Sequence, residues 1–130
     1  MEYAVEMLHV SLIVVLGHEG CGAVAAATAT LDGAAVPPGY IRDIAERIAP
    51  NVLRARSAGA RTATEIGGQH SLMIIELLRQ RSSIVENAVQ YGGVQAVATQ
   101  YSLSTGLVSE VHPLTRPADV LALEPALAVA

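Results

Sequence analysis

The sequence predicts an α/β fold in which helices flank a mainly parallel sheet that ends in a C-terminal hairpin. Residues 12–16 form a short, continuously apolar run of mostly β-branched side chains, which is typical of a strand covered on both faces. Helical patterns follow over most of residues 22–91, and two strand-like runs joined by a tight turn occupy residues 94–112. Strand, helices and strand in this order indicate an α/β domain.

The first third of the chain contains a helix, the apolar strand and a second helix. Residues 2–9 pair apolar side chains four positions apart, which predicts a helix, but no capping residue stands before it. We therefore expect the chain to start inside a helix. After the strand, Gly22–Leu31 is rich in alanine and reads as a helix that ends at Asp32-Gly33.

The middle of the chain is mostly helical. Residues 34–39 form a loop with two prolines, and residues 40–56 follow a helical pattern that Pro50 should kink or split. Residues 57–68 contain three glycines and are ambiguous, whereas residues 71–80 present a clear apolar helix face.

The last elements are a short helix and the hairpin. Ser82 or Ser83 caps a helix that runs to Tyr91. Residues 94–103 and 107–112 read as two strands joined by the turn at residues 104–106. We expect one domain over residues 1–112 and an irregular, proline-containing tail over residues 113–130.

Composition excludes several classes of protein. The net charge is −4, there is no lysine and the arginines do not cluster, so nucleic acid is not an expected partner. No apolar stretch reaches the length that spans a bilayer, and Glu2 and Glu6 stand where a signal peptide would be basic. The default is a cytoplasmic protein. The 52% hydrophobic content suggests large buried interfaces.

The chemistry-bearing feature is the segment "GHEGCG", in which His18 and Cys21 follow the apolar strand. Both side chains are good zinc ligands, and a turn between a strand and a helix would let them converge on one ion. A cysteine nucleophile with a histidine base, a glycine-rich phosphate cradle, and plain packing of a buried cysteine are the alternatives that spacing leaves open. The other histidines, His9, His70 and His112, fit structural or solvated positions better.

The residues around this segment resemble the β-class carbonic anhydrases. Residues 2–27, "EYAVEMLHVSLIVVLGHEGCGAVAAA", are similar to the family pattern E-Y-A-V-x-x-L-x-V-x-x-I-V-V-x-G-H-x-x-C-G-A-V. Residues 94–108 resemble the family's late strand-turn-strand, I-V-G-A-x-Y-D-L-x-T-G-x-V, with Ala98-Thr99 in place of Gly-Ala and Ser102 in place of Asp. The resemblance covers about residues 2–111.

The resemblance implies a zinc enzyme, a lyase that interconverts CO2 and bicarbonate. In the family two cysteines and one histidine hold the zinc, and the motif match assigns His18 and Cys21 as the histidine and the second cysteine. Family members dimerise, so the resemblance also implies a homo-oligomer or a partner chain. Zinc would lower the pKa of a bound water toward ~7.

The sequence departs from the family in what precedes this region. The family's first zinc cysteine lies in an upstream Cys-x-Asp-x-Arg motif whose Asp and Arg form a catalytic pair, and neither occurs in these 130 residues. We therefore expect an incomplete β-carbonic anhydrase fold, an incomplete zinc site, no catalytic pair and an exposed strand edge at residues 12–16. Water, another chain or His70 would have to complete the metal ligands.

Four interpretations remain open. The first is a truncated carbonic anhydrase with impaired activity, and the second is a non-catalytic oligomerisation or regulatory fragment. The third is a different enzyme that uses Cys21 as a nucleophile, and the fourth is a gene whose real start lies upstream of Met1.

Overall fold

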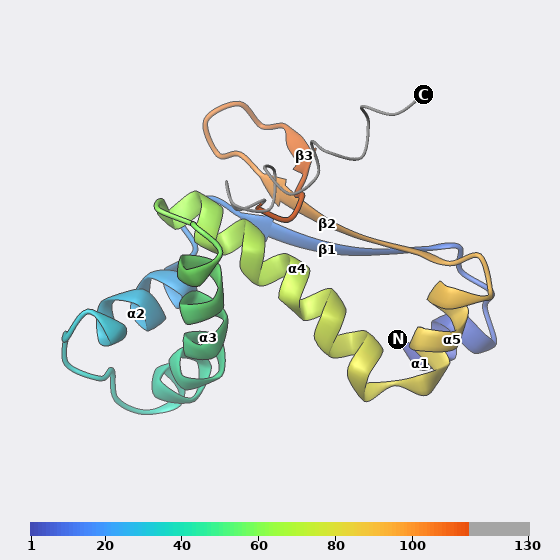
Figure 1. Cartoon of the computed structure of the whole chain (residues 1–130), viewed down its shortest axis with the longest axis horizontal. Helices are drawn as coiled ribbons and strands as arrows, with labels where there is room; N and C mark the ends of the chain where they lie inside the picture. The colour runs from blue at the N-terminus through green and yellow to red at the C-terminus, as the bar shows by residue number, and fades with distance from the viewer. Residues whose placement is uncertain (115–130) are drawn as a thin grey trace, which may run out of the picture.

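The structure, a computed structural model, describes residues 1–114 (Figure 1). Within them a strand near the amino end and two strands near the carboxyl end enclose a run of four helices. The elements are α1 (Glu2–Glu6), β1 (Leu12–His18), α2 (Gly22–Leu31), α3 (Tyr40–Ser57), α4 (Ala63–Arg81), α5 (Ser83–Gln90), β2 (Gln95–Tyr101) and β3 (Val108–Glu110).

The three strands form one small mixed sheet in the order β1-β2-β3. β1 and β2 are parallel, in a register that pairs Leu12 with Gln95 and His18 with Tyr101. β3 is antiparallel to β2 and pairs Glu110 with Thr99. The α/β class and the C-terminal hairpin are confirmed, and the parallel pair has its carboxyl ends beside the loop that follows His18.

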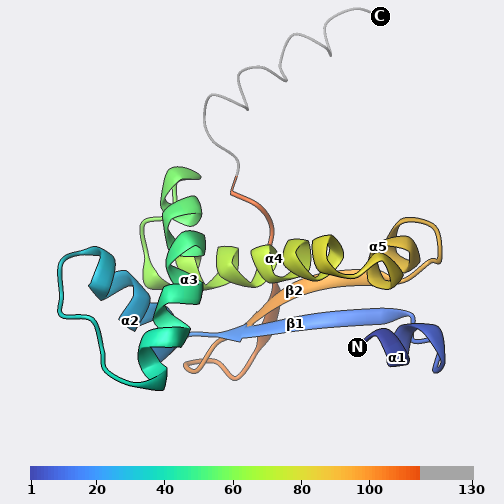
Figure 2. The same ribbon diagram turned by 90° about the horizontal axis from the view of Figure 1, so that it is seen from below.

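α4 lies along one face of β1 and β2 (Figure 2). Ile13 and Ala98 point to that side and are buried, at 6% and 1% exposed. The alternate side chains of β1, Leu12, Val14 and Leu16, remain about half exposed. The expectation that this apolar run is covered on both faces is therefore wrong for residues 1–114, where the burial alternates with the pleat.

Two other expectations are corrected at helix boundaries. α1 ends at Glu6 rather than at His9, and His9 has a left-handed backbone (φ 52°), so it lies outside the helix. α3 continues through Pro50, so the predicted split is wrong, and the predicted kink stays a prediction. A proline inside a helix removes one backbone hydrogen bond, but apolar side chains on both sides of it, Ile48 and Val52, are buried and hold the segment helical.

α4 begins earlier than its apolar pattern predicts. Thr62 accepts a hydrogen bond from the amide of Glu65, and the Glu65 carboxylate accepts one from the amide of Thr62, which is a capping box. The ambiguous stretch at residues 57–68 thus contains the end of α3, a short connection and the first turns of α4. This capping box marks the first turn of α4, the helix that packs against β1 and β2.

Two hydrophobic clusters hold the elements together. The first joins α2, α3 and α4 around the fully buried Val52 and Ala55, and the side chain of Cys21 packs against its edge. The second joins α1, β1 and α5 around Val85. The loop between β1 and α2 is therefore anchored at both ends, by the sheet before it and by the first cluster after it.

Two further predictions concern the C-terminal tail and membrane-spanning helices. Of the tail expected at residues 113–130, Pro113 and Leu114 are described and the remainder lies outside the described residues. None of the helices in residues 1–114 combines the length and hydropathy that crossing a membrane requires.

Candidate metal centre

His18 and Cys21 lie at the carboxyl end of β1, where it meets α2. His18 is the last residue of the strand, Glu19 and Gly20 make the turn, and Cys21 is the residue that precedes the first turn of α2. Gly20 has a left-handed backbone (φ 67°), which glycine adopts without steric cost. The local sequence thus makes a short turn between β1 and α2 and keeps both ligand candidates within four residues.

The ring of His18 has one nitrogen engaged and one free. Its Nδ1 lies 2.9 Å from the backbone oxygen of Glu19. A carbonyl oxygen only accepts, so Nδ1 is the donor in this contact, and in a neutral ring with this tautomer Nε2 has the lone pair. A histidine that binds a metal generally donates its other N–H to such an acceptor, which fixes the tautomer and the ring orientation. The side chain is exposed, so Nε2 is accessible.

Cys21 is a free cysteine with a half-buried side chain. It occupies the N-cap position of α2, yet its side chain makes no capping hydrogen bond. Cysteine sulfur is a common zinc ligand. Cys21 and His18 therefore both fit the demands that zinc makes of a ligand.

Glu19, between them, connects this loop to the turn after β2. Its carboxylate accepts hydrogen bonds from the hydroxyl of Ser102, at 3.0 Å, and from the amide of Leu103, at 2.9 Å. Its own amide donates to the oxygen of Tyr101, at 3.0 Å. Its partners lie more than eighty positions away, and only the register of β1 and β2 could have indicated them.

The residues described do not complete a metal site. In the stretch from Met1 to Leu114, no three histidine, cysteine, aspartate or glutamate side chains come together in a way that could hold an ion. His70 therefore does not join His18 and Cys21. His18 and Cys21 fit zinc as two ligands, and the chain has no second cysteine.

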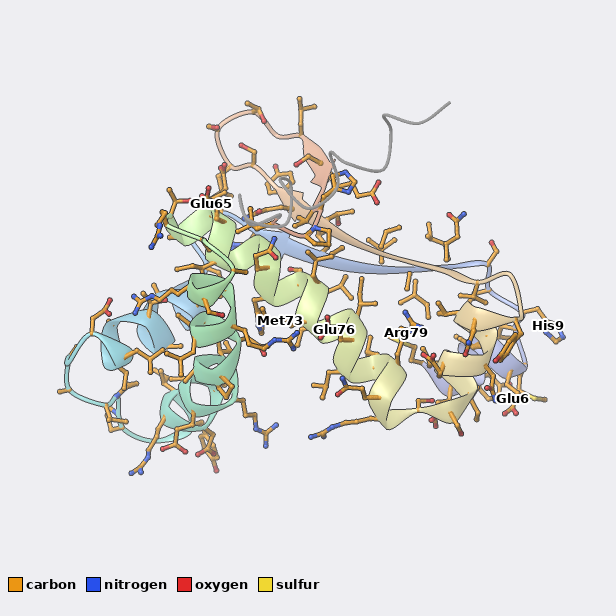
Figure 3. The ribbon with its side chains drawn as sticks, viewed as in Figure 1. Glu6, His9, Glu65, Met73, Glu76 and Arg79 are labelled. Atoms are coloured by element: carbon orange, nitrogen blue, oxygen red, sulfur yellow. The ribbon has the colours of Figure 1, made fainter. Side chains whose placement is uncertain are left out.

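His70 belongs instead to a cavity between α3 and α4. The side-chain amide of Asn51 lies 2.9 Å from its Nδ1, and the cavity has a volume of about 890 Å³. Burial lowers the pKa of His70, so the ring is neutral near pH 7. His112 is exposed and contributes its backbone oxygen to the side chain of Gln69. His9 lies near the amino end of β1, on the opposite side of the molecule from the loop (Figure 3). The structural or solvated roles expected of these three histidines stay predictions.

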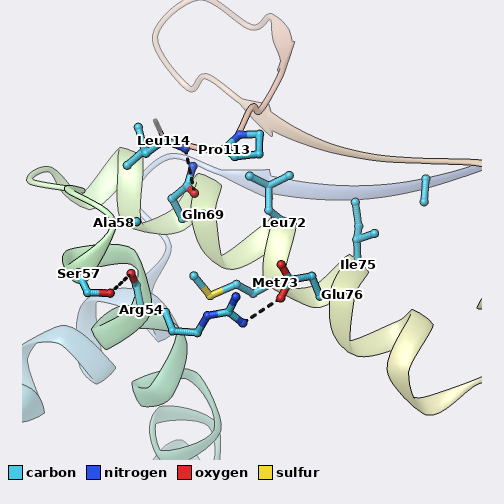
Figure 4. Close-up of a pocket in the computed structure, with 11 residues that line it drawn as sticks. Arg54, Ser57, Ala58, Gln69, Leu72, Met73, Ile75, Glu76, Pro113 and Leu114 are labelled. Atoms are coloured by element: carbon cyan, nitrogen blue, oxygen red, sulfur yellow. Dashed lines mark hydrogen bonds and ion pairs between the residues drawn. The ribbon is translucent and has the colours of Figure 1, made fainter. Parts of the chain in front are cut away.

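A second cavity, of about 460 Å³, lies between α4 and the segment around Leu114 (Figure 4). An ion pair of 2.9 Å between Arg54 and Glu76 crosses its edge, and the side chain of Gln69 accepts a hydrogen bond from the amide of Leu114. The cavity contains neither of the two ligand candidates.

Comparison with known proteins agrees with this arrangement. A family model described as carbonic anhydrase matches residues 1–108. The carbonic anhydrase of Mycolicibacterium smegmatis is 43% identical over 108 residues, which are 83% of this chain and 52% of that protein. Carbonic anhydrase 2 of Mycobacterium tuberculosis is 42% identical over 106 residues, or 82% of this chain and 51% of that protein. The chain thus spans about half the length of these curated relatives.

Solved structures show the same fold at lower identity. A tetrameric β-carbonic anhydrase of Sordaria macrospora superposes with a TM-score of 0.70 at 22% identity, over 85% of this chain and 56% of that one. The β-carbonic anhydrase CafA of Aspergillus fumigatus superposes with a TM-score of 0.64 at 21% identity, over 99% of this chain and 62% of that one. At these identities the likeness establishes the arrangement of helices and strands.

Proposed function

Since the chain belongs to the β-class carbonic anhydrases, we propose that it serves the reversible hydration of CO2 to bicarbonate, with His18 and Cys21 as two ligands of a catalytic zinc ion. Carbonate dehydratases are lyases. One observation carries the proposal: two zinc-type donors stand three residues apart at the carboxyl end of a parallel strand, with the histidine tautomer fixed by the Glu19 carbonyl. Chemistry in open α/β sheets occurs at this edge.

The residues of this chain have separable roles in the proposed site. When zinc is bound, it supplies a water acidic enough to ionise near neutral pH. His18 presents Nε2 to the ion, because Nδ1 is held by the oxygen of Glu19. Cys21 presents its sulfur from the amino end of α2. Neither side chain is required to move a proton during the reaction.

We further propose that a polypeptide confined to these 130 residues has little hydratase activity. The sequence contains one cysteine, and it contains no segment that matches the family's Asp–Arg pair. Two protein ligands leave positions around a tetrahedral ion to water or to residues of another chain. A homo-oligomer, or a partner chain that provides those residues, belongs to the same proposal, and the S. macrospora neighbour is tetrameric. A cytoplasmic location and the lack of a nucleic-acid partner stay predictions from composition.

The test combines metal binding with turnover. Cobalt(II) is titrated into the chain and into H18A and C21S, and the near-ultraviolet absorption from sulfur to cobalt is recorded. We expect the band in the parent chain, its loss in C21S and a binding at least tenfold weaker in H18A. Stopped-flow CO2 hydration with zinc present should stay close to the buffer rate. A parent chain that binds no more cobalt than C21S would refute the assignment of the ligands, and fast turnover would refute the prediction of low activity.

A non-catalytic oligomerisation or regulatory fragment is the second candidate. The half-exposed apolar side chains of β1, Leu12, Val14 and Leu16, favour it, because an apolar sheet face of this kind is a surface that proteins usually cover. Co-purification with a longer carbonic anhydrase, without cobalt binding by the chain alone, would support this candidate over the first.

A further inference from the structure

We propose that Glu19 is a positioning residue that fixes His18 and Cys21 in place by fastening their loop to the turn after β2. The inference rests on the proposed function, since it concerns the two residues assigned there as zinc ligands. Glu19 takes part in four hydrogen bonds that together we call the Glu19 bridge. They join its carboxylate to Ser102 and Leu103, its amide to Tyr101, and its carbonyl oxygen to His18.

The Glu19 bridge acts on the ligands through both backbone and side chain. The carbonyl oxygen that orients the His18 ring belongs to Glu19. The carboxylate of the same residue accepts hydrogen bonds from the hydroxyl of Ser102, at 3.0 Å, and from the amide of Leu103, at 2.9 Å. A rotation of the peptide that follows Glu19 would therefore turn the imidazole as well. Hydrogen bonds to a carboxylate are about twice as strong as those between neutral groups. They hold the loop more firmly than the bond from the Glu19 amide could alone.

The loop needs such a constraint because its own residues provide little. Gly20 and Gly22 flank Cys21, and a Cβ added at Gly22 would meet nothing within 4 Å. At Gly20 the nearest atom to an added Cβ is Cδ1 of Leu103, at 3.8 Å, which comes from the same turn that the Glu19 bridge reaches. The sheet and the first cluster hold the two ends of the loop, so without the bridge the remaining backbone freedom between His18 and Cys21 lies at Gly20.

The turn is a suitable anchor because it is internally bonded. The amide of Ser102 donates to the oxygen of Leu107, at 2.9 Å, and the amide of Gly106 donates to the oxygen of Ser102, at 2.9 Å. The hydroxyls of Ser102 and Ser104 lie 3.0 Å apart. The Glu19 bridge thus ties a glycine-rich loop to a closed hairpin turn.

The bridge also couples positions 19 and 102. The hydroxyl of Ser102 donates to the Glu19 carboxylate at 3.0 Å. An aspartate at this position would place a second carboxylate within hydrogen-bond distance of the first, and the two negative charges would repel. Positions 19 and 102 are therefore coupled. S102D should disrupt the loop when residue 19 is Glu, and E19Q should remove the conflict, because an amide can donate to an aspartate.

The experiment uses the full 130-residue chain and measures two quantities in each variant. The first is solvent exchange of the amide at position 19 by NMR, without metal, with the Val94 amide, which donates to the oxygen of Ala88, as the internal reference. The second is the cobalt(II) dissociation constant from the sulfur-to-cobalt band. E19A removes the carboxylate, and E19Q keeps its shape as the conservative variant. E110A, at an exposed glutamate of β3, is the matched control. Circular dichroism confirms that each variant is folded at the temperature used.

We expect E19A and S102D each to raise amide exchange at position 19 at least tenfold and to weaken cobalt binding at least tenfold, which is the range seen when groups that orient metal ligands are removed. E19Q should lose less than E19A, E110A should stay within twofold of the parent chain, and E19Q/S102D should return to within threefold of it. Cobalt binding by E19A within twofold of the parent chain would overturn the inference, and so would an equal loss of cobalt affinity in S102D and E19Q/S102D. Either result would leave the proposed zinc ligands standing. A parent chain without the band would instead show that the proposed zinc ligands are wrong, and the inference would fall with them.

Discussion

Replacement of Gly17 by alanine should destabilise the protein through one identifiable contact. Gly17 directly precedes His18 in β1, and a Cβ added there would lie 2.6 Å from Oγ of Ser71 in α4. Ordinary contacts begin at 3.4 Å, so the methyl group would be about 0.8 Å too close. Ser71 is only 3% exposed, and its hydroxyl donates to the oxygen of Gly67 at 3.3 Å, so it cannot turn away freely.

The cost follows from overpacking at a helix–sheet contact. Added volume in a close-packed interior typically costs about 1–3 kcal/mol in the free energy of unfolding. At a typical slope of about 1–3 kcal/mol per molar urea, G17A should lower the urea midpoint by roughly 1 M and leave the slope unchanged. The midpoint temperature of thermal unfolding should fall by about 4 °C for each kcal/mol of lost stability.

The double variant G17A/S71A isolates the contact. S71A alone removes one long hydrogen bond and should cost less than about 1 kcal/mol. It also removes the atom that the new methyl group would meet, so the cost of G17A should shrink to well under about 1 kcal/mol in that background. An unfolding midpoint for G17A equal to that of the parent, or an equal cost in both backgrounds, would refute the reasoning.

Further predictions concern packing, capping and pH. V52A, at a fully buried side chain in α3, should cost about 2 kcal/mol in urea unfolding, whereas V36A, half exposed, should stay within about 0.5 kcal/mol. T62A removes the capping box of α4 and should cost about 1 kcal/mol, whereas T64A in the first turn should be nearly neutral; a similar loss in both would contradict the assignment of the cap. Burial lowers the pKa of His70, so between pH 7 and pH 5.5 the unfolded chain binds more protons than the folded one, and stability should fall as the pH drops through the ordinary histidine value of about 6.5. H70Q should flatten the dependence of stability on pH in this range, and an unchanged slope in H70Q would contradict the assignment of the effect to His70.

Local patterns predicted most of the helices and strands because their signals lie within a few residues. The alanine-rich run after Cys21 forms α2 at Gly22–Leu31 as expected, and Ser82 caps α5 with its hydroxyl 3.2 Å from the amide of Val85. The start of α4 was missed for a tertiary reason. Gly68 weakens the helical pattern, yet a Cβ there would lie 3.0 Å from both Gln100 and Val111, so glycine is present to let the helix approach the sheet.

The candidate site divides in the same way. The motif around His18 and Cys21 pointed to a strand end followed by a helix, and the structure has that arrangement, while their metal binding stays a prediction. The contacts of Glu19 could not be read from neighbouring residues, because Ser102 is 83 positions away in the chain. Only the parallel register of β1 and β2 brings the two segments together.

That parallel register also has a kinetic consequence. α2, α3 and α4 are neighbours in sequence and can pack through short loops, whereas β1 and β2 meet only after a long loop has closed. Closing such a loop costs entropy before the contacts between the strands can offset it, so parallel pairing of distant strands is generally slow. We therefore expect the loop with His18 and Cys21 to reach its final geometry late in folding, after the helical cluster beside it has formed.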